Sequence, residues 1–132
     1  MGRLQDKVAI ITGAGQGIGL AYAHRFLAEG AKVVVAEIDE TRAAAAMSGL
    51  EGLGEVLAVR TDVADEASAQ ACVDATVERF GTVDILVNNA ALYYDIDNFD
   101  ASLAYLQKVT AVNQHGAWIM AKAAAPVMAA QR

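Results

Sequence analysis

The sequence has little cysteine, little proline and few basic residues. Its single cysteine, Cys72, excludes an internal disulfide and fits a protein of a reducing compartment. Because Cys72 lies in an alanine-rich helical pattern, we interpret it as a buried structural thiol. Ten Lys and Arg residues against 16 Asp and Glu residues give a net charge of −6. This acidic balance argues against a surface that binds nucleic acid through its phosphates, so no nucleic-acid partner is expected.

The sequence also lacks long apolar runs and clusters of metal-ligating residues. No apolar stretch reaches the length that spans a membrane, and the first seven residues contain no apolar core of a signal peptide. We therefore expect a cytoplasmic protein without a membrane partner. The only histidines, His24 and His115, are not part of a spaced His/Cys cluster. The sequence therefore predicts no metal site, and both histidines are interpreted as surface or helix-packing residues.

What the sequence does contain is an alternation of strand-like and helix-like segments. Short apolar runs predict strands, at residues 8–12, 32–36, 56–60 and 83–88, and the second of them is a nearly continuous valine run. Helical patterns lie between and after them, at residues 18–29, 40 to about 47, 66–80, 102–112 and 114–130. Asp39 and Asp65 are predicted N-caps, and Gly81 is a predicted helix end. We expect the apolar residues Ile18, Tyr22, Phe26 and Leu27 near one face of the first helix, and a kink at Pro126 in the last one.

Repeated strand–helix–strand units of this kind predict an α/β fold. Right-handed crossovers give a Rossmann-type doubly wound parallel sheet with strand order 3-2-1-4, and residues 1–132 form a single domain. Ligands of such sheets bind at the carboxyl ends of the strands, beside the point where the strand order reverses. The loops that follow Thr12, Ala36, Arg60 and Asn88 are all expected at that edge.

The first of these loops is rich in glycine and opens directly into a helix. Residues 12–19 read Thr-Gly-Ala-Gly-Gln-Gly-Ile-Gly. Free backbone N–H groups at a helix N-terminus attract phosphate, and glycines let the backbone approach it closely. We therefore predict nucleotide binding by Gly13, Gly15, Gln16, Gly17, Ile18 and Gly19.

An acidic residue ends the second predicted strand. Glu37 follows the glycine loop by about 20 residues, where a dinucleotide fold places a carboxylate on the adenine ribose hydroxyls. Because a carboxylate repels a 2′-phosphate, NAD is favoured over NADP. The alternative is that Glu37 is only solvated and that Arg42 recognises a phosphate. Asp62 and Val63 follow the third strand as candidate adenine contacts, although Asp62 could equally be a loop cap.

Four blocks of the sequence together resemble the short-chain dehydrogenase/reductase family. They are residues 12–19, Asp62-Val63, Asn88-Asn89-Ala90 and residues 112–116, in the order and spacing of that family. The resemblance implies a Rossmann fold, a nicotinamide cofactor and hydride exchange with a small alcohol or carbonyl substrate. It also implies that Asn88 and Ala90 contact the cofactor, and that Asn113 belongs to the catalytic set. Ala91 stands where the family usually has glycine.

The resemblance further implies residues that this sequence does not contain. The family uses a tyrosine as acid/base, a lysine four residues later and a serine. No Tyr-x-x-x-Lys occurs here, and the four tyrosines are followed four places later by Phe26, Asp97, Asn98 and Val109. We therefore expect the cofactor-binding half of an NAD-dependent oxidoreductase, incomplete at the C-terminal side of the sheet and inactive by itself.

Two alternatives stay open at this point. One is a genuine short nucleotide-binding module without dehydrogenase activity. The other is a methyltransferase, which also uses a glycine loop and an acid at the end of the second strand. Tyr93 and Tyr94 follow the fourth predicted strand. One of them could contact the nicotinamide or the substrate, or both could simply cover the loop. The resemblance also suggests that the last two helices pair subunits in a homo-oligomer, and packing on the sheet would occupy a different face.

Overall fold

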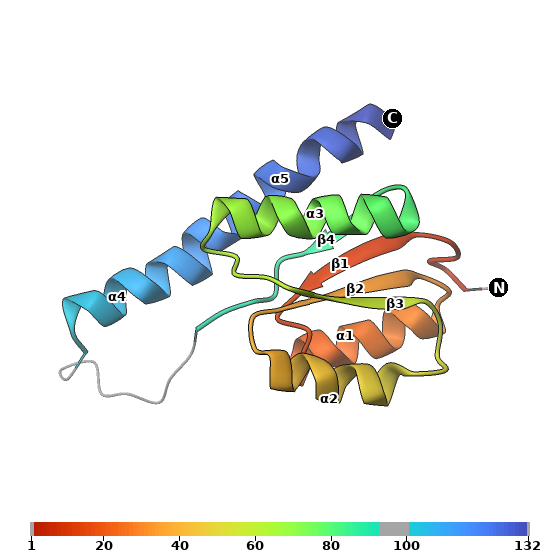
Figure 1. The fold of residues 1–132 in the computed structure, drawn as a ribbon, viewed down its shortest axis with the longest axis horizontal. Helices are drawn as coiled ribbons and strands as arrows, with labels where there is room; N and C mark the ends of the chain where they lie inside the picture. Colours follow the sequence, from red (N-terminus) through yellow and green to blue (C-terminus); the bar gives the residue numbers. More distant parts are fainter. Residues whose placement is uncertain (1, 93–100, 132) are drawn as a thin grey trace.

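The computed structural model describes residues 2–92 and 101–131 and contains one parallel four-stranded sheet. Its strands are β1 (Val8–Thr12), β2 (Lys32–Glu37), β3 (Val56–Arg60) and β4 (Ile85–Val87). They lie in the order β3-β2-β1-β4, which confirms the predicted topology (Figure 1). The sheet edge at the strand carboxyl ends therefore gathers the four loops expected there.

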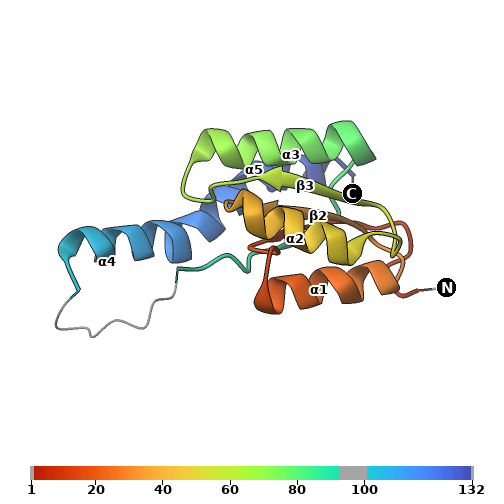
Figure 2. The ribbon, with the colours of Figure 1, turned by 60° about the horizontal axis from the view of Figure 1, so that its bottom comes forward.

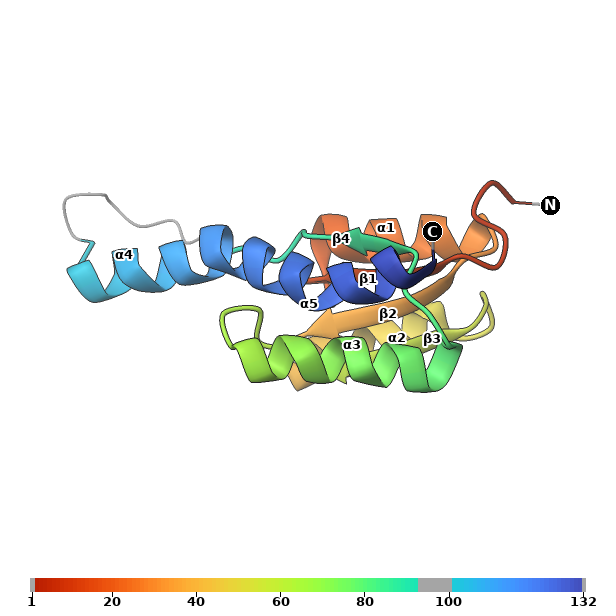
Figure 3. The same cartoon turned by 90° about the horizontal axis from the view of Figure 1, so that it is seen from above.

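Helices cover both faces of the sheet. Helices α1 (Gly17–Ala28) and α2 (Glu40–Leu50) lie on one face, and α3 (Glu66–Phe80) and α5 (Gly116–Gln131) lie on the other (Figures 1 and 2). Seen from above, α3 and α5 run side by side over the strands (Figure 3). This arrangement explains the valine runs, because strands covered on both faces have no solvent side.

Alternate residues of each strand enter two separate cores. Ile10 and Val34 pack into the core with Met120 of α5. Their neighbours Ile11 and Val35 pack into the core on the α1 and α2 side. All four strand side chains are fully buried, as the period of two along a strand requires.

The predicted apolar face of α1 is confirmed at Leu27, which is buried, and at Phe26, which packs against the same core, but it is wrong at Ile18 and Tyr22. Ile18 is 67% exposed and Tyr22 is 42% exposed, whereas Gly19, Ala23 and Leu27 are buried. At the start of α1 a glycine makes the contact, because this part of the helix lies close to the backbone after β1. A methyl group at Gly19 would lie 2.5 Å from the Gly13 carbonyl oxygen.

The fourth strand is shorter than predicted, although the residues before it are well ordered in the core. Only Ile85–Val87 pairs with β1. Val83 is fully buried, and Asp84 bonds β1 through both its backbone and its side chain. The Val8 amide donates to Asp84 Oδ2 at 2.9 Å, and the Asp84 amide donates to the Val8 carbonyl at 2.9 Å. The side-chain bond takes the place of a ladder bond at this end.

Several helix boundaries also differ from the sequence prediction. Helix α2 extends to Leu50, three residues beyond its predicted end. The last two predicted helices form one continuous helical run, in which α4 (Leu103–Thr110) passes through a π-turn, η1 (Ala111–His115), into α5. Pro126 lies inside α5, which continues to Gln131. The caps at Asp39 and Asp65 are confirmed, and Gly81 ends α3 with a left-handed φ of 84°.

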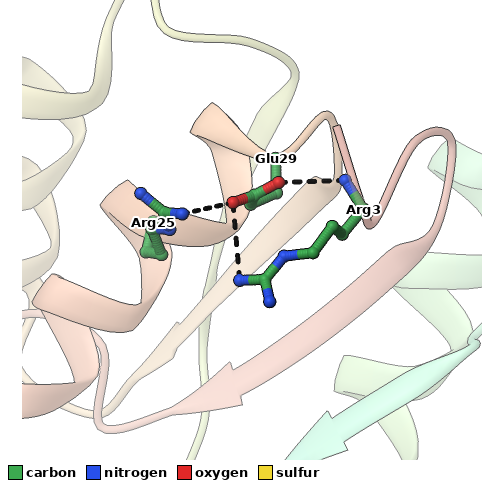
Figure 4. A network of polar contacts seen from close by, with 3 residues as sticks. All are labelled: Arg3, Arg25 and Glu29. Atoms are coloured by element: carbon green, nitrogen blue, oxygen red, sulfur yellow. Dashed lines mark hydrogen bonds and ion pairs between the residues drawn. The ribbon is translucent and has the colours of Figure 1, made fainter. Parts of the chain in front are cut away.

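At the opposite edge of the sheet, the N-terminal segment is tied to the end of α1. The Arg3 amide donates to Glu29 Oε2 at 2.9 Å, and the Arg3 guanidinium lies 3.5 Å from Glu29 Oε1. Arg25 contacts the same carboxylate from one helical turn earlier (Figure 4). The hydrogen bond from the Arg3 amide, with the charges of Arg25 and Arg3, lowers the pKa of Glu29.

Candidate cofactor-binding site

A pocket of about 640 Å³ opens at the carboxyl ends of the strands. Each of the four loops at this edge contributes to it, and α4 and η1 close one side. The lining residues are Gly13, Gln16, Gly17, Ile18, Glu37, Ile38, Asp39, Arg42, Asp62, Val63, Ala64, Asn89, Ala90, Ala91, Leu92, Lys108, Ala111 and Val112. The pocket therefore lies beside the switch point between β1 and β4, where sheets of this type bind ligands.

The glycine-rich loop presents the N-terminus of α1 to this pocket. Gln16 is the N-cap in extended conformation, its side chain makes no capping bond, and the first turn holds no acidic residue. The free N–H groups and the helix dipole therefore have no anionic side chain of that turn to neutralise them. Gly17 has a φ of 57°, which favours glycine, and a methyl group there would meet open space. Such a loop can approach a phosphate group.

Glu37 lies at the end of β2 with only 5% of its surface exposed. Its Oε1 accepts a hydrogen bond from the Gly15 amide at 3.1 Å, and its Oε2 accepts one from the Asp39 amide at 3.1 Å. A carboxylate offers about four acceptor positions, and these two amides use two of them. Arg42, the alternative phosphate-binding residue, lines the same pocket from α2.

Thr12 and Asn89 join the two strands on either side of the switch point. The Thr12 hydroxyl accepts from the amides of Asn89 and Ala90, at 3.0 and 2.9 Å. The Asn89 side-chain amide donates to the carbonyls of Thr12 and Gly13, at 3.1 and 3.3 Å. These bonds fix the loop after β4 against the glycine-rich loop, so that both line one pocket.

Asn113 lies in the π-turn and holds the segment that follows β4. Its Oδ1 accepts from the Leu92 amide at 2.6 Å, and its Nδ2 donates to the Leu92 carbonyl at 3.0 Å. The neutral amide side chain can satisfy both a donor and an acceptor, which a carboxylate could not do. Asn113 thus joins η1 to the β4 loop through a pair of hydrogen bonds.

The third loop places Asp62 and Val63 on the pocket wall. Asp62 Oδ1 accepts from the Ala64 amide at 3.0 Å, so this residue does cap its loop, as one of the two readings of Asp62 expects. Val63 is 5% exposed and packs against Gly116 of α5, where a methyl group would lie 2.6 Å from Val63 Cγ2.

Several predicted contacts lie off the pocket wall. Asn88 donates from Nδ2 to the Ala117 carbonyl at 3.3 Å, and Asn89 lines the pocket next to it. Gly15 and Gly19 belong to the same loop but do not line the pocket. The Gly15 amide donates to Glu37, and Gly19 lies close to Asn89 and Gly13. Ile38, Asn89 and Lys108 also line the pocket and were not predicted from the sequence. For Asn89 the available signal is its place just after the fourth strand, at the carboxyl edge of the sheet.

The remaining chemical candidates lie outside the pocket. Cys72 is fully buried, which confirms its interpretation as a structural thiol. Burial raises the pKa of the Cys72 thiol, and a hydrogen bond with Thr61 offsets part of that rise. Tyr93 and Tyr94 lie outside the described residues. In residues 2–92 and 101–131 no group of three His, Cys, Asp or Glu could hold a metal, and no helix is long and apolar enough to cross a membrane.

Comparison with known proteins gives one consistent set of relatives. The chain is 43% identical to galactitol 2-dehydrogenase of Agrobacterium fabrum over 129 residues, which cover 98% of this chain and 50% of that protein. It is 38% identical to sorbitol dehydrogenase of Cereibacter sphaeroides, over 97% of this chain and 49% of that protein. The chain thus spans about half the length of these curated relatives.

A solved structure shows the same fold. A short-chain dehydrogenase/reductase from Burkholderia phymatum in complex with NAD superimposes with a TM-score of 0.91 at 38% identity. The match covers 99% of this chain and 47% of that one. The short chain dehydrogenase family model matches residues 7–132. With the sheet order, the glycine-rich loop and the pocket described above, this match shows that the chain belongs to the short-chain dehydrogenase/reductase family.

Proposed function

We propose that this chain is the NAD-binding part of an oxidoreductase that exchanges hydride with a small alcohol or carbonyl substrate. The observation that carries this proposal is the pocket in which a free helix N-terminus and a buried carboxylate face the same space. The first suits a diphosphate, and the second suits two ribose hydroxyls. Substrate names such as galactitol and sorbitol among the relatives support an alcohol as the substrate class.

The lining residues fit the parts of a dinucleotide in order along the sheet edge. The loop around Gly17 would hold the diphosphate, and Glu37 would accept the adenine ribose hydroxyls. Asp62 and Val63 would lie beside the adenine, with the apolar Ile38 and Val112 near them. Ala90, which lines the pocket, is a proposed contact of the nicotinamide half, whereas the Asn88 side chain donates to the Ala117 carbonyl off the pocket wall. When bound, NAD supplies the hydride acceptor, and the residues of this chain bind and orient it.

Asn113 is the proposed member of the catalytic set on this chain. Its side chain orients the Leu92 segment at the pocket mouth. An amide does not titrate near neutral pH, so Asn113 positions groups and does not act as the acid/base.

We also propose that α4 and α5 pair two copies of the protein. Leu103, Leu106 and Trp118 leave 69%, 57% and 59% of their surfaces exposed along these helices. Burying such side chains against a second copy would remove apolar surface from water. This is the homo-oligomer that the family resemblance implies.

A ligand titration tests the proposed cofactor class. The rise in NADH fluorescence on adding the protein should follow a single-site curve, and S-adenosylmethionine should not compete. Competition by S-adenosylmethionine without NADH binding would support the methyltransferase alternative instead. NADH binding together with turnover of an alcohol by the 132-residue chain would require an acid/base among these residues, against the expectation for a chain without Tyr-x-x-x-Lys.

A further inference from the structure

We infer that Glu37 and Gly15 act as one unit that sets the shape of the glycine-rich loop. In this unit Glu37 is a positioning residue that braces the loop from the strand side. Gly15 is glycine because the Glu37 carboxylate occupies the space that a side chain would need. The consequences for ligand binding rest on the proposed NAD site, whereas the brace itself belongs to the ligand-free protein.

The first observation is the position of the carboxylate between three segments. Glu37 itself ends β2, its Oε1 accepts from the Gly15 amide in the loop after β1, and its Oε2 accepts from the Asp39 amide at the turn into α2. The Gly15 bond joins residues 22 positions apart and is buried. Within the described part of the chain Glu37 forms no ion pair, so these backbone donors are its protein partners. Hydrogen bonds to an ionised acceptor are stronger than neutral ones.

The second observation is the space around Gly15. A methyl group there would lie 2.5 Å from Glu37 Oε1, 2.7 Å from Cγ and 2.9 Å from Cδ. The backbone of Gly15 does not lie in the left-handed region, unlike that of Gly13 and Gly17, with φ of 65° and 57°. Conformation therefore requires glycine at those two positions, while at Gly15 the Glu37 side chain does.

This coupling has a consequence for the proposed ribose site. A side chain at position 15 would displace the carboxylate, leave the Gly15 amide without its acceptor and move the group proposed to accept the ribose hydroxyls. The other explanation is that Gly15 only lets the backbone approach the diphosphate. The two explanations differ in one respect: only the first makes the effect of a Gly15 substitution depend on the residue at position 37.

A double-mutant cycle with Gly15→Ala, Glu37→Ala and the double variant separates them. The readouts are thermal unfolding of the ligand-free protein and the Kd for ADP-ribose by isothermal titration calorimetry. We expect Gly15→Ala to lower the unfolding temperature and to weaken ADP-ribose binding at least tenfold. In the Glu37→Ala background, which removes all three close atoms, the same substitution should change the Kd less than twofold and should not lower the unfolding temperature further.

Two matched variants sharpen the cycle. Glu37→Gln keeps the shape of the side chain, so Gly15→Ala should remain harmful in that background. Gly49→Ala in α2, where a methyl group meets nothing within 4 Å, should leave ADP-ribose binding unchanged and should not lower the unfolding temperature, because alanine favours a helix interior over glycine. Equal effects of Gly15→Ala in the presence and absence of the Glu37 side chain would overturn the inference, as would no effect in the wild-type background. If ADP-ribose did not bind the wild-type protein, the proposed function would fail, and non-additive unfolding temperatures would still support the brace.

Discussion

Gly17 and Gly19 lie two positions apart in the loop, yet a side chain would have different surroundings at each. At Gly19 a methyl group would lie 2.5 Å from both Asn89 Nδ2 and the Gly13 carbonyl oxygen. At Gly17 it would meet open space beside the pocket, on a backbone with a φ of 57°. Steric crowding therefore requires glycine at Gly19, and backbone conformation together with ligand approach requires it at Gly17.

We predict different effects for a substitution at each position: a loss of stability at Gly19 and a loss of NADH binding at Gly17. Gly19→Ala should destabilise the ligand-free protein by about 1–3 kcal/mol, because backbone atoms would have to shift. Gly17→Asn should retain most of the stability, since asparagine tolerates the left-handed region, but it should weaken NADH binding at least tenfold. Thermal unfolding and NADH titration measure the two effects. Normal NADH binding by a folded Gly17→Asn variant would show that this residue has no part in ligand approach.

Glu29 makes a pH-dependent contribution to stability at the other edge of the sheet. Its pKa is lowered from the ordinary value of 4.5, first by the hydrogen bond from the Arg3 amide. A lowered pKa in the folded state contributes stability above the unfolded pKa, and the contribution is lost as the pH falls through the folded pKa. We therefore expect Glu29→Gln to unfold at a lower urea concentration than wild type at pH 7, with the difference disappearing in acid.

Glu78→Gln is the matched control for Glu29. Glu78 is an exposed carboxylate on α3 with no ion pair in the described part of the chain. Its replacement should leave the urea midpoint unchanged at both pH values. If the difference in urea midpoint between wild type and Glu29→Gln grew as the pH fell, the lowered pKa assigned to Glu29 would be contradicted.

At the scale of elements, the π-turn and the β4 loop depend on one side chain. Asn113 makes two hydrogen bonds with the Leu92 backbone, at 2.6 and 3.0 Å, in exposed surroundings. Asn113→Ala should lower the free energy of unfolding by about 1–2 kcal/mol, since each net bond contributes about 1 kcal/mol. Chemical denaturation measures this change, and the neighbouring exposed Gln114→Ala serves as the control. Equal stability of the two variants would remove the proposed structural role of Asn113.

Most elements could be predicted from the sequence because local signals agreed with the final packing. Short apolar runs rich in β-branched residues predicted β1, β2 and β3, and side chains at Asp39 and Asp65 predicted the starts of α2 and α3. The misses arise from contacts between distant segments. Ile18 and Tyr22 have the spacing of a buried face, yet at the start of α1 it is Gly19 that packs closely against the loop after β1, and Ile18 and Tyr22 stay exposed.

The residues of the candidate site also divide into those that local signals predict and those that depend on contacts between distant segments. Strand ends and loop glycines identified Gly17, Glu37 and Asp62 at the pocket edge. Lys108 lines the pocket from α4, which leads into the π-turn, and no local spacing predicts that α4 lies at this edge of the sheet. Likewise, the Gly15–Glu37 contact links residues that are 22 positions apart and depends on the length of the Glu37 side chain.

At the scale of the whole molecule, α4 and α5 leave apolar side chains uncovered. We predict that the protein is a dimer or larger and that Trp118→Glu dissociates it, because a carboxylate would replace buried apolar surface at the proposed contact. Sedimentation velocity over a range of concentrations measures the mass. Leu53→Glu, at a 47% exposed apolar residue away from these helices, should leave the mass unchanged. A wild-type monomer at every concentration would contradict the proposed pairing.

The preference between NADH and NADPH, measured by calorimetric titration of wild type and Glu37→Ala, tests the central claim most directly. The buried Glu37 carboxylate should accept two ribose hydroxyls and repel a 2′-phosphate. Wild type should therefore bind NADH at least tenfold more tightly than NADPH, a difference of about 1.4 kcal/mol. Glu37→Ala should reduce that ratio towards one. Equal affinities in the wild-type protein, or a ratio that Glu37→Ala leaves unchanged, would contradict the assignment of this pocket as an NAD site.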